Sequence, residues 1–189
     1  MRIQRAWQSQ KSRQKGGEVR ITSGEYRGRR IFTPGGATHP MGEREKLALF
    51  NMISENVLDA QVLDAYAGSG ALGIEALSRE ARFCVFIDDN AAAAETIREN
   101  LKALGITTGR VVKSSVSSFT SDEKFDLIIA DPPYDGFKID EIEYLGGFLA
   151  DDGILVLSHP DEIVEIKGLK LAKTRQYARA HISIFTKLS

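Results

Sequence analysis

The sequence predicts an α/β fold built on a mostly parallel, doubly wound sheet. A glycine loop follows an apolar run that ends at Asp64, and strand and helix patterns then alternate along the chain. A second polar loop, which begins at Asp131, follows the apolar run 125–130. Loops of this kind meet at the carboxyl edge of a parallel sheet, so a ligand site is expected there.

The composition indicates one domain without disulfides. The chain has 189 residues, of which 42% are hydrophobic, and its one cysteine, Cys84, lies inside an apolar run. No apolar run is long enough to cross a membrane, and no signal-peptide pattern is visible at the N-terminus. We therefore expect a cytoplasmic, monomeric protein without membrane association.

Charge is distributed unevenly along the chain. Residues 1–30 contain nine Lys or Arg and two Glu, whereas the remaining 159 residues carry a net charge of −8. A basic arm on an acidic body indicates that the arm binds a polyanion. Residues 1–18 have too little apolar content to pack and are predicted to be a disordered tail, which is either a solvated or cloning-derived segment or an RNA contact.

The first structured element is expected to be a β-hairpin over residues 19–33, within the domain 19–189. Two short strands, 19–23 and 29–33, flank a glycine-containing turn. Arginines and Tyr26 in this hairpin suit phosphate contact and base stacking. An exposed edge hairpin kept soluble by charge is the alternative.

A helix is predicted from about Glu43 to Asn56. The residues expected to face the core recur at helical spacing: Leu47, Phe50, Ile53 and Val57. Arg44 and Lys46 lie off this stripe, and they are expected either to be solvated or to face a substrate.

The glycine loop is typical of a nucleotide-cofactor site. Gly68, Gly70 and Gly73 have the G-x-G-x-x-G spacing, a helix over 71–78 directs its amides at the loop, and Asp88 occupies a position suited to a ribose hydroxyl. A pyrophosphate at this loop would be repelled by the Asp64 carboxylate. S-adenosylmethionine, with a positive ammonium and sulfonium, is therefore favoured over a dinucleotide.

Strands and helices alternate after the loop. Strands are predicted over 83–87, 110–113, 125–130 and 154–157, and helices over 91–104 and 139–149. Two final strands, near 169–174 and 181–186, are expected to form an antiparallel hairpin because their connection is too short for a crossover helix.

The second chemical motif is Asp131-Pro132-Pro133-Tyr134. Asp-Pro-Pro also occurs in ordinary turns, but its place directly after the predicted strand 125–130 favours a methyltransferase site. The Asp131 carboxylate and the Pro132 carbonyl can accept the two hydrogens of an exocyclic base amine and aim its lone pair at a sulfonium methyl. Tyr134 can stack on the extruded base.

Together these motifs resemble the RsmD family of 16S ribosomal RNA guanine-N2 methyltransferases, from about Val19 to the end of the chain. The hairpin 20–29, the segment 38–51, the loop 67–77 and the tetrad 131–134 carry the resemblance. It implies a Rossmann-like S-adenosylmethionine-dependent methyltransferase fold. The chain differs from the family pattern where Arg, an acidic residue and Gly are usual: His39, Ser115 and Ala178.

The motifs and the resemblance together define a predicted site. Catalysis is assigned to the tetrad: Asp131, Pro132, Pro133 and Tyr134. Cofactor contacts are assigned to the loop and the following strand ends: Asp64, Tyr66, Ala67, Gly68, Ser69, Gly70, Asp88, Asp89 and Ser115. RNA contacts are assigned to the hairpin and the first helix region: Arg20, Tyr26, Arg27, Arg29, Arg30, His39 and Arg44. No histidine has a partner at metal-ligand spacing, so no metal is expected.

The predicted reaction is transfer of a methyl group from S-adenosyl-L-methionine to the exocyclic N2 of a guanine in small-subunit ribosomal RNA, within a 30S particle or an assembly intermediate. Two alternatives remain open. One is an adenine-N6 methyltransferase acting on DNA or RNA, because the same tetrad can hold either amine. The other is a non-catalytic RNA-binding assembly factor with the same fold.

Overall fold

The computed structural model describes residues 16–35, 41–135, 138–160, 164–177 and 180–188. The expectations for His39 and Ala178, and for all but the last residues of the 1–18 tail, lie outside this range.

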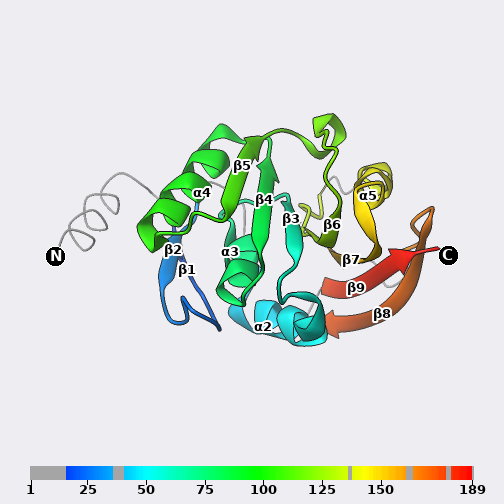
Figure 1. The fold of residues 1–189 in the computed structure, drawn as a ribbon, viewed down its shortest axis with the longest axis horizontal. Helices are drawn as coiled ribbons and strands as arrows, with labels where there is room; N and C mark the ends of the chain where they lie inside the picture. Colours follow the sequence, from blue (N-terminus) through cyan, green and yellow to red (C-terminus); the bar gives the residue numbers. More distant parts are fainter. Residues whose placement is uncertain (1–15, 36–40, 136–137, 161–163, 178–179, 189) are drawn as a thin grey trace.

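The described residues form a seven-stranded main sheet with the order β5-β4-β3-β6-β7-β9-β8 (Figure 1). Strands β3 to β7 run parallel, whereas β9 is antiparallel to both β7 and β8. The bounds of the strands are β3 Gln61–Ala65, β4 Phe83–Asp88, β5 Gly109–Lys113, β6 Phe125–Ala130, β7 Leu149–His159, β8 Leu169–Tyr177 and β9 Ala180–Lys187. The predicted α/β fold and its terminal antiparallel hairpin are confirmed.

Strand order changes direction at β3, which lies between β4 and β6. The chain first proceeds from β3 through β4 to β5 and then crosses to the other side of β3 to form β6. Loops at the carboxyl ends of β3 and β6 therefore diverge and leave a crevice between them. This crevice is the point in the fold where a ligand is expected.

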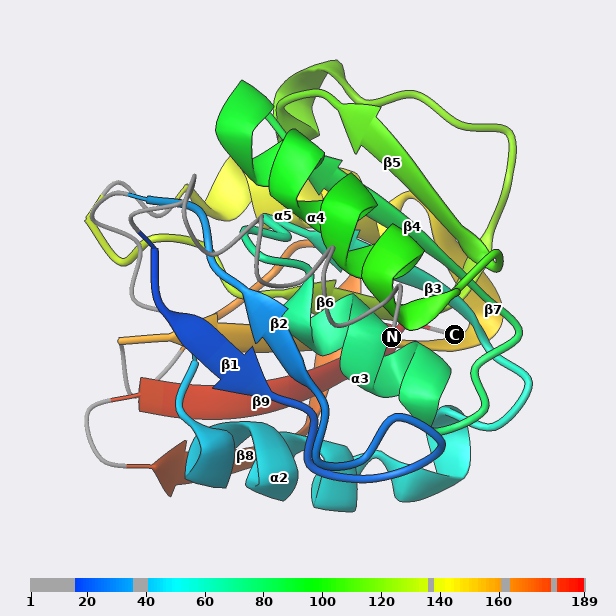
Figure 2. The same cartoon turned by 90° about the vertical axis from the view of Figure 1, so that its left-hand side faces the viewer.

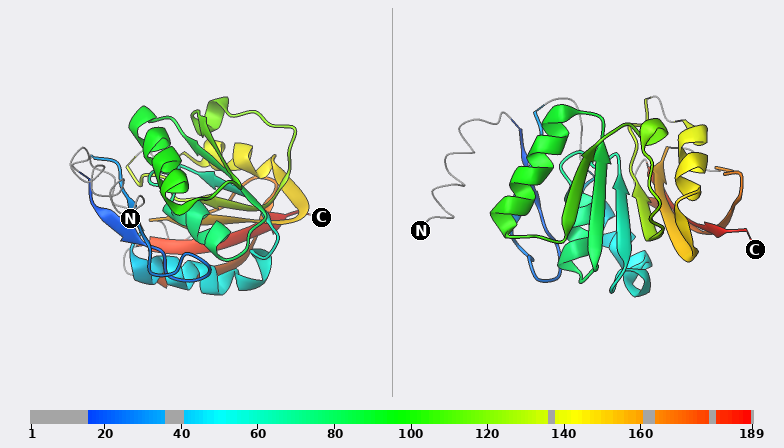
Figure 3. Two further views of the ribbon diagram at one scale, coloured as in Figure 1. Left: turned by 60° about the vertical axis from the view of Figure 1, so that its left-hand side comes forward. Right: turned by 45° about the horizontal axis from the view of Figure 1, so that its top comes forward.

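Helices cover both faces of the sheet (Figure 3). Helices α2 (Glu43–Met52), α3 (Ala71–Ser78) and α4 (Ala91–Leu104) share one core, which includes Leu49, Ile74 and Ile97. On the other face, α5 (Ile139–Gly146) and the short 3₁₀-helix η2 (Val116–Ser118) enclose a second core. The central parallel strands β3, β4 and β6 are largely apolar on both sides because both sides are covered.

The N-terminal hairpin forms a separate two-stranded sheet of β1 (Glu18–Arg20) and β2 (Arg30–Phe32) rather than an edge of the main sheet (Figure 2). Its strands are shorter than the sequence predicts because residues 21–29 turn against α3. Gly24 has a φ of +79°, and a Cβ there would lie 1.6 Å from the carbonyl oxygen of Ser78. Glycine alone permits this close packing of the turn on the helix.

The prediction for the first helix was partly wrong. Helix α2 ends at Met52 and is followed by the 3₁₀-helix η1 (Ser54–Asn56). Leu47, predicted to be in the core, is 43% exposed, whereas Lys46, predicted to be solvated or to face a substrate, is fully buried. Lys46 can replace an apolar residue in the buried stripe because the Glu75 carboxylate lies 3.0 Å from its ammonium nitrogen.

The predicted helix over 139–149 extends too far. Helix α5 ends at Gly146, and Leu149 already belongs to β7, where it pairs with Phe125. Two consecutive glycines, Gly146 and Gly147, weaken the helix at this point. Strand β7 continues to His159, beyond the predicted 154–157, because β9 pairs with it over this extra length. None of the helices in the described residues is long and apolar enough to span a membrane.

Candidate active site

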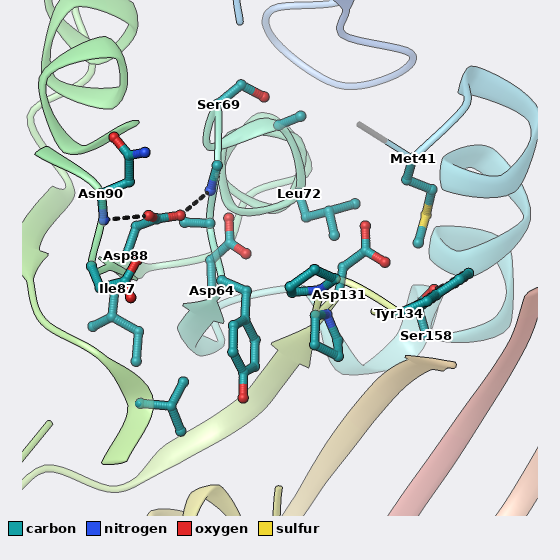
Figure 4. Close-up of a pocket in the computed structure, with 18 of the residues that line it drawn as sticks. Met41, Asp64, Ser69, Leu72, Ile87, Asp88, Asn90, Asp131, Tyr134 and Ser158 are labelled. Atoms are coloured by element: carbon teal, nitrogen blue, oxygen red, sulfur yellow. Dashed lines mark hydrogen bonds between the residues drawn. The ribbon is translucent and has the colours of Figure 1, made fainter. Parts of the chain in front are cut away.

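A pocket of about 790 Å³ lies at the carboxyl edge of the sheet, in the crevice between the loops after β3 and β6 (Figure 4). Loops that follow β4 and β5 complete one side of it, and the start of α2, the end of β7 and the start of β9 complete the other. The predicted cofactor loop and the predicted catalytic tetrad therefore line one cavity.

The loop after β3 is held open by residues in left-handed backbone conformations. Tyr66 has a φ of +60°, Gly68 of +56° and Gly70 of +77°. The Gly70 amide donates to the Ala67 carbonyl at 2.6 Å, and Gly70 is the N-cap of α3. Gly70 is not among the residues that line the pocket, and its left-handed backbone shapes the turn into α3.

Asp64 is the penultimate residue of β3 and is only 1% exposed. Its Oδ2 accepts a hydrogen bond from the Gly73 amide at 2.8 Å. Gly73 has no room for a side chain, since a Cβ there would lie 2.9 Å from this same oxygen. Burial raises the pKa of Asp64 well above its usual range; the Gly73 hydrogen bond offsets this only in part, and the charges of Asp131 and Asp88 add to it. A cationic ligand would stabilise the ionised form.

Asp88, at the end of β4, is fixed by two backbone amides. Its Oδ2 accepts from Gly68 at 2.8 Å, and its Oδ1 accepts from Asn90 at 2.9 Å (Figure 4). Asn90 in turn caps α4 by accepting from the amides of Ala92 and Ala93. Asp88 thus connects the glycine loop to the next helix and holds its carboxylate in the pocket wall. Sequence reasoning missed Asn90, although an Asn before an Ala-rich helix is a typical N-cap.

Five other predicted cofactor contacts line the same pocket. These are Tyr66, Ala67, Ser69, Asp89 and Ser115. The Tyr66 hydroxyl donates to Glu141 Oε2 on α5 at 2.7 Å, and burial, with the hydrogen bond and charge of Glu141, raises the pKa of this phenol. Glu141 was missed because it lies 75 residues away in the sequence and joins the site only through the packing of α5.

The predicted catalytic tetrad lies across the pocket from the glycine loop (Figure 4). Pro132 is buried, whereas Pro133 and Tyr134 are exposed on the cavity side. Burial raises the pKa of Asp131 above its usual range, and a hydrogen bond with Ser158 opposes this shift. The Tyr134 and Ser158 hydroxyls are 2.9 Å apart, so Ser158 also anchors the tyrosine ring (Figure 4). Sequence reasoning missed Ser158 because its place beside the tetrad depends on β7 pairing with β6.

The pocket is strongly acidic. Among its described lining residues, one is basic, Lys138, and seven are acidic: Glu45, Asp64, Asp88, Asp89, Asp131, Asp135 and Glu141. Lys138 itself lies 3.5 Å from Glu141. Such a lining favours a positively charged ligand and disfavours a pyrophosphate, which fits S-adenosylmethionine better than a dinucleotide.

Comparison with known proteins identifies the family. A family model described as conserved hypothetical protein 95 matches residues 19–186. The ribosomal RNA small subunit methyltransferase D of Escherichia coli strain K12 is 35% identical over 145 residues, which are 74% of this chain and 73% of the relative. The chain belongs to the RsmD family.

Further relatives agree with RsmD membership. A putative rRNA methyltransferase of Bacillus subtilis is 31% identical over 184 residues, which cover 89% of this chain and 99% of the relative. The solved structure of a putative methyltransferase from E. coli is 30% identical, covers 90% of this chain and 98% of that protein, and has a TM-score of 0.82. The predicted family, fold and enzyme class, an rRNA methyltransferase, are confirmed.

The predicted RNA contacts that the structure describes do not line the pocket. Five arginines are exposed on the hairpin and α2: Arg20, Arg27, Arg29, Arg30 and Arg44. Arg20 pairs with Glu43 at 2.8 Å, and Arg30 pairs with Glu18 at 3.2 Å. Tyr26 is half-buried and packs against the core, so only part of its ring is available for stacking.

A buried carboxylate on α3, the helix that follows the cofactor loop, binds the N-terminal hairpin. Glu75, on α3, is fully buried and accepts hydrogen bonds from Thr22 and from the Ser23 amide at 2.6–3.0 Å. Lys46 and Arg79 each lie 3.0 Å from one of its oxygens. Burial alone would raise the pKa of Glu75, but Lys46 and the Thr22 hydrogen bonds outweigh it, and the pKa is lowered. No sequence motif indicated this network.

Proposed function

We propose that this chain methylates the exocyclic N2 of a guanine in small-subunit ribosomal RNA, using S-adenosylmethionine. One observation carries the proposal. The Asp131 carboxylate, which suits an amine, lines the same acidic pocket as Asp64 and Asp88, which suit a cationic nucleoside. An amine and a sulfonium methyl group can therefore meet within a single cavity.

The cofactor site is assigned from the chemistry of the lining. Asp64 neutralises the positive charge of the methionine end, and Asp88, already oriented by Gly68 and Asn90, accepts from the ribose hydroxyls. Ser115 faces the adenine side and is a weaker acceptor than a carboxylate. When bound, S-adenosylmethionine supplies a methyl group that is electrophilic because it is attached to a positive sulfur.

The tetrad holds the acceptor amine. The Asp131 carboxylate and the Pro132 carbonyl accept one hydrogen each, which directs the nitrogen lone pair away from the ring and toward the methyl carbon. The new bond joins nitrogen to this carbon while the electrons of the carbon–sulfur bond pass to sulfur. The surplus proton on nitrogen then leaves to Asp131 or water, and the raised pKa of Asp131 favours its acceptance. Tyr134, anchored by Ser158, supports the base by stacking.

The setting of the reaction is proposed from the charge distribution. Exposed arginines of the hairpin and Arg44 contact RNA phosphates, and the substrate is a 30S particle or an assembly intermediate. We propose that the protein acts as a monomer in the cytoplasm, where this substrate is assembled, and that it needs no metal.

The decisive experiment is transfer of labelled methyl from S-adenosylmethionine to 30S particles that lack guanine-N2 methylation. The RNA is digested, and the modified nucleoside is identified by mass. N2-methylguanosine supports the proposal. Label in methyladenosine would instead support the adenine-N6 alternative, and no label despite cofactor binding would support a non-catalytic assembly factor.

The role of Asp131 has its own test. We expect Asp131→Ala to lower kcat by a factor on the order of 10² to 10³, the usual cost of losing one preorganised polar contact to the reacting group. Cofactor affinity, measured by calorimetry, should change little. Asp122→Ala, which removes an exposed carboxylate, is the matched control. Equal losses of turnover and cofactor affinity would show that Asp131 is structural.

A further inference from the structure

The edge strand β8 carries a row of basic side chains that do not line the candidate active site. Lys170, Lys173 and Arg175 are all exposed. The last 21 residues of the chain contain five Lys or Arg and no Asp or Glu, although the chain as a whole has a net charge of −1. This strand is therefore a local basic surface on a largely acidic body. We refer to Lys170, Lys173 and Arg175 as the β8 basic row.

Strand register places the β8 basic row on one face of the sheet. Lys173 is opposite Ile184, and Arg175 is opposite Ile182. Both isoleucines belong to the core shared by α2, α3, α4 and the hairpin. Directly opposed residues of an antiparallel pair project from the same face, so the row faces the same side as α2 and the hairpin.

The strand that carries the β8 basic row ends at the pocket. Tyr177, the last residue of β8, lines the cavity, and its hydroxyl lies 3.7 Å from the sulfur of Met52 at the end of α2. The other end of α2 is joined to the hairpin, because Arg20 pairs with Glu43. Helix α2 therefore lies between the hairpin and β8, as Figure 1 shows. From Lys170 to Tyr177 the strand spans roughly 23 Å.

The charges of the β8 basic row are available to a ligand. Within the described part of the chain, none of the three residues forms an ion pair with a carboxylate, and Arg175 donates only to the carbonyl of Thr174. By contrast, Lys187 on the neighbouring strand pairs with Asp151 at 3.0 Å. A row of unpaired cations that ends at a pocket complements the phosphates of a nucleic acid strand.

We infer that the β8 basic row is a second RNA-binding surface, which holds the ribosomal RNA on the side of α2 opposite the hairpin. This inference rests on the proposed function, because the proposed reaction has RNA as its substrate. RNA is then the polyanion that reaches the pocket. RNA phosphates contact the hairpin on one side and β8 on the other, and the target nucleotide enters the pocket between them. Lysines on an edge strand also hinder strand pairing between molecules, so the test must separate the two roles.

The test variant replaces all three residues by glutamine: Lys170→Gln, Lys173→Gln and Arg175→Gln. The matched control replaces three exposed basic residues at the amino ends of the strands, on the edge of the sheet away from the pocket: Arg82→Gln, Arg110→Gln and Lys124→Gln. Binding of an unmethylated 16S ribosomal RNA transcript is measured by fluorescence anisotropy at several salt concentrations. Methyl transfer to unmethylated 30S particles and affinity for S-adenosylmethionine are measured in parallel.

We expect the β8 variant to bind the transcript roughly tenfold or more weakly, with a salt dependence reduced by about two in slope, since each lost phosphate contact removes about 0.7. KM for 30S particles should rise, while kcat and cofactor affinity remain unchanged. The control should behave like the wild type. Unchanged RNA affinity and salt slope in the β8 variant would overturn the inference, and new self-association on a sizing column in that case would assign the lysines to edge protection.

The two proposals fail differently. If the wild-type protein binds the transcript but methylates no RNA, the proposed reaction is wrong, and the binding comparison still tests the β8 surface. If N2-methylguanosine forms at equal KM in both variants, the reaction stands and the β8 surface is refuted.

Discussion

Asp64 is the residue at which ligand binding and stability oppose each other. Its carboxylate is buried beside two other acidic residues, and its pKa is well above the usual 3.8. A carboxyl with a raised pKa in the folded state binds protons more tightly there than in the unfolded chain. The free energy of unfolding therefore falls as pH rises from the unfolded pKa through the folded one.

Asp64→Asn should remove this cost. We expect the variant without cofactor to be at least as stable as the wild type at pH 7, because the amide oxygen can still accept from Gly73. Its affinity for S-adenosylmethionine should fall by about 10-fold to 100-fold, the cost of losing a hydrogen bond to a charged group. Thermal unfolding and calorimetry measure the two effects. A destabilised variant with normal affinity would contradict this account.

Tyr134 combines a ring that can stack and a hydroxyl anchored by Ser158. Tyr134→Phe retains the ring, so we expect kcat/KM for RNA to fall less than about tenfold, the worth of one neutral hydrogen bond. Tyr134→Ala should cost about 10-fold to 100-fold, as for loss of one base–aromatic stack. Ser158→Ala should cost at least as much as the Phe variant, because Ser158 also hydrogen-bonds Asp131. Equal losses for Phe and Ala would show that the hydroxyl, rather than the ring, is required.

At the scale of elements, α3 connects three parts of the molecule. It begins at the cofactor loop, its Gly73 packs on β3 and β4, and its Glu75 holds the turn of the hairpin. A displacement of the hairpin would therefore be transmitted to the helix that ends the cofactor loop. The network is costly to disrupt, because removal of one member leaves a buried charge without its partner.

Glu75→Gln should destabilise the protein by about 3 kcal/mol or more, since Lys46 is then buried without a counter-charge. The double variant with Lys46→Met should recover part of this loss. The pKa of Glu75 is lowered in the folded state, so its contribution is present above the unfolded pKa and is lost as pH falls through the folded one. Urea unfolding at several pH values measures these effects. The exposed Glu95→Gln is the control, and an equal loss there would refute the assignment.

At the scale of the whole molecule, the sheet order gathers groups that lie far apart in the chain. Asp64, Asp88 and Asp131 lie at or next to the carboxyl ends of β3, β4 and β6, which are neighbours in the sheet, and the charges of Asp88 and Asp131 raise the pKa of Asp64. A cationic cofactor relieves the repulsion among these charges and binds only the folded state. Binding should therefore raise the stability of the entire domain.

S-adenosylmethionine at 100 times its Kd should stabilise the domain by about 2.7 kcal/mol. For a chain of this size, that corresponds to a rise in Tm of roughly 5–10 °C. Asp88→Ala should abolish most of the shift, whereas Asp122→Ala should preserve it. The measurement is thermal unfolding with and without cofactor, and an unchanged Tm at saturating cofactor would contradict binding to the folded protein.

The sequence by itself determined the α/β class, the strand that carries each motif, and the chemistry of the two loops. Those features depend on local patterns: glycine spacing, apolar runs and the stiff Asp-Pro-Pro segment act within a few residues of each other. The helix errors arose where local patterns were ambiguous. Lys46 and Leu47 both suit a helix, and only the presence of Glu75 across the interface decided which one was buried.

Only the tertiary structure decided which distant residues complete the site. Ser158 and Glu141 have no motif of their own and join the pocket because β7 pairs with β6 and α5 packs beside Tyr66. Likewise, the face of the sheet on which the β8 basic row lies follows only from the register of β8 with β9. Pairing and packing are long-range, and their free energy depends on partners that a local window of sequence does not contain.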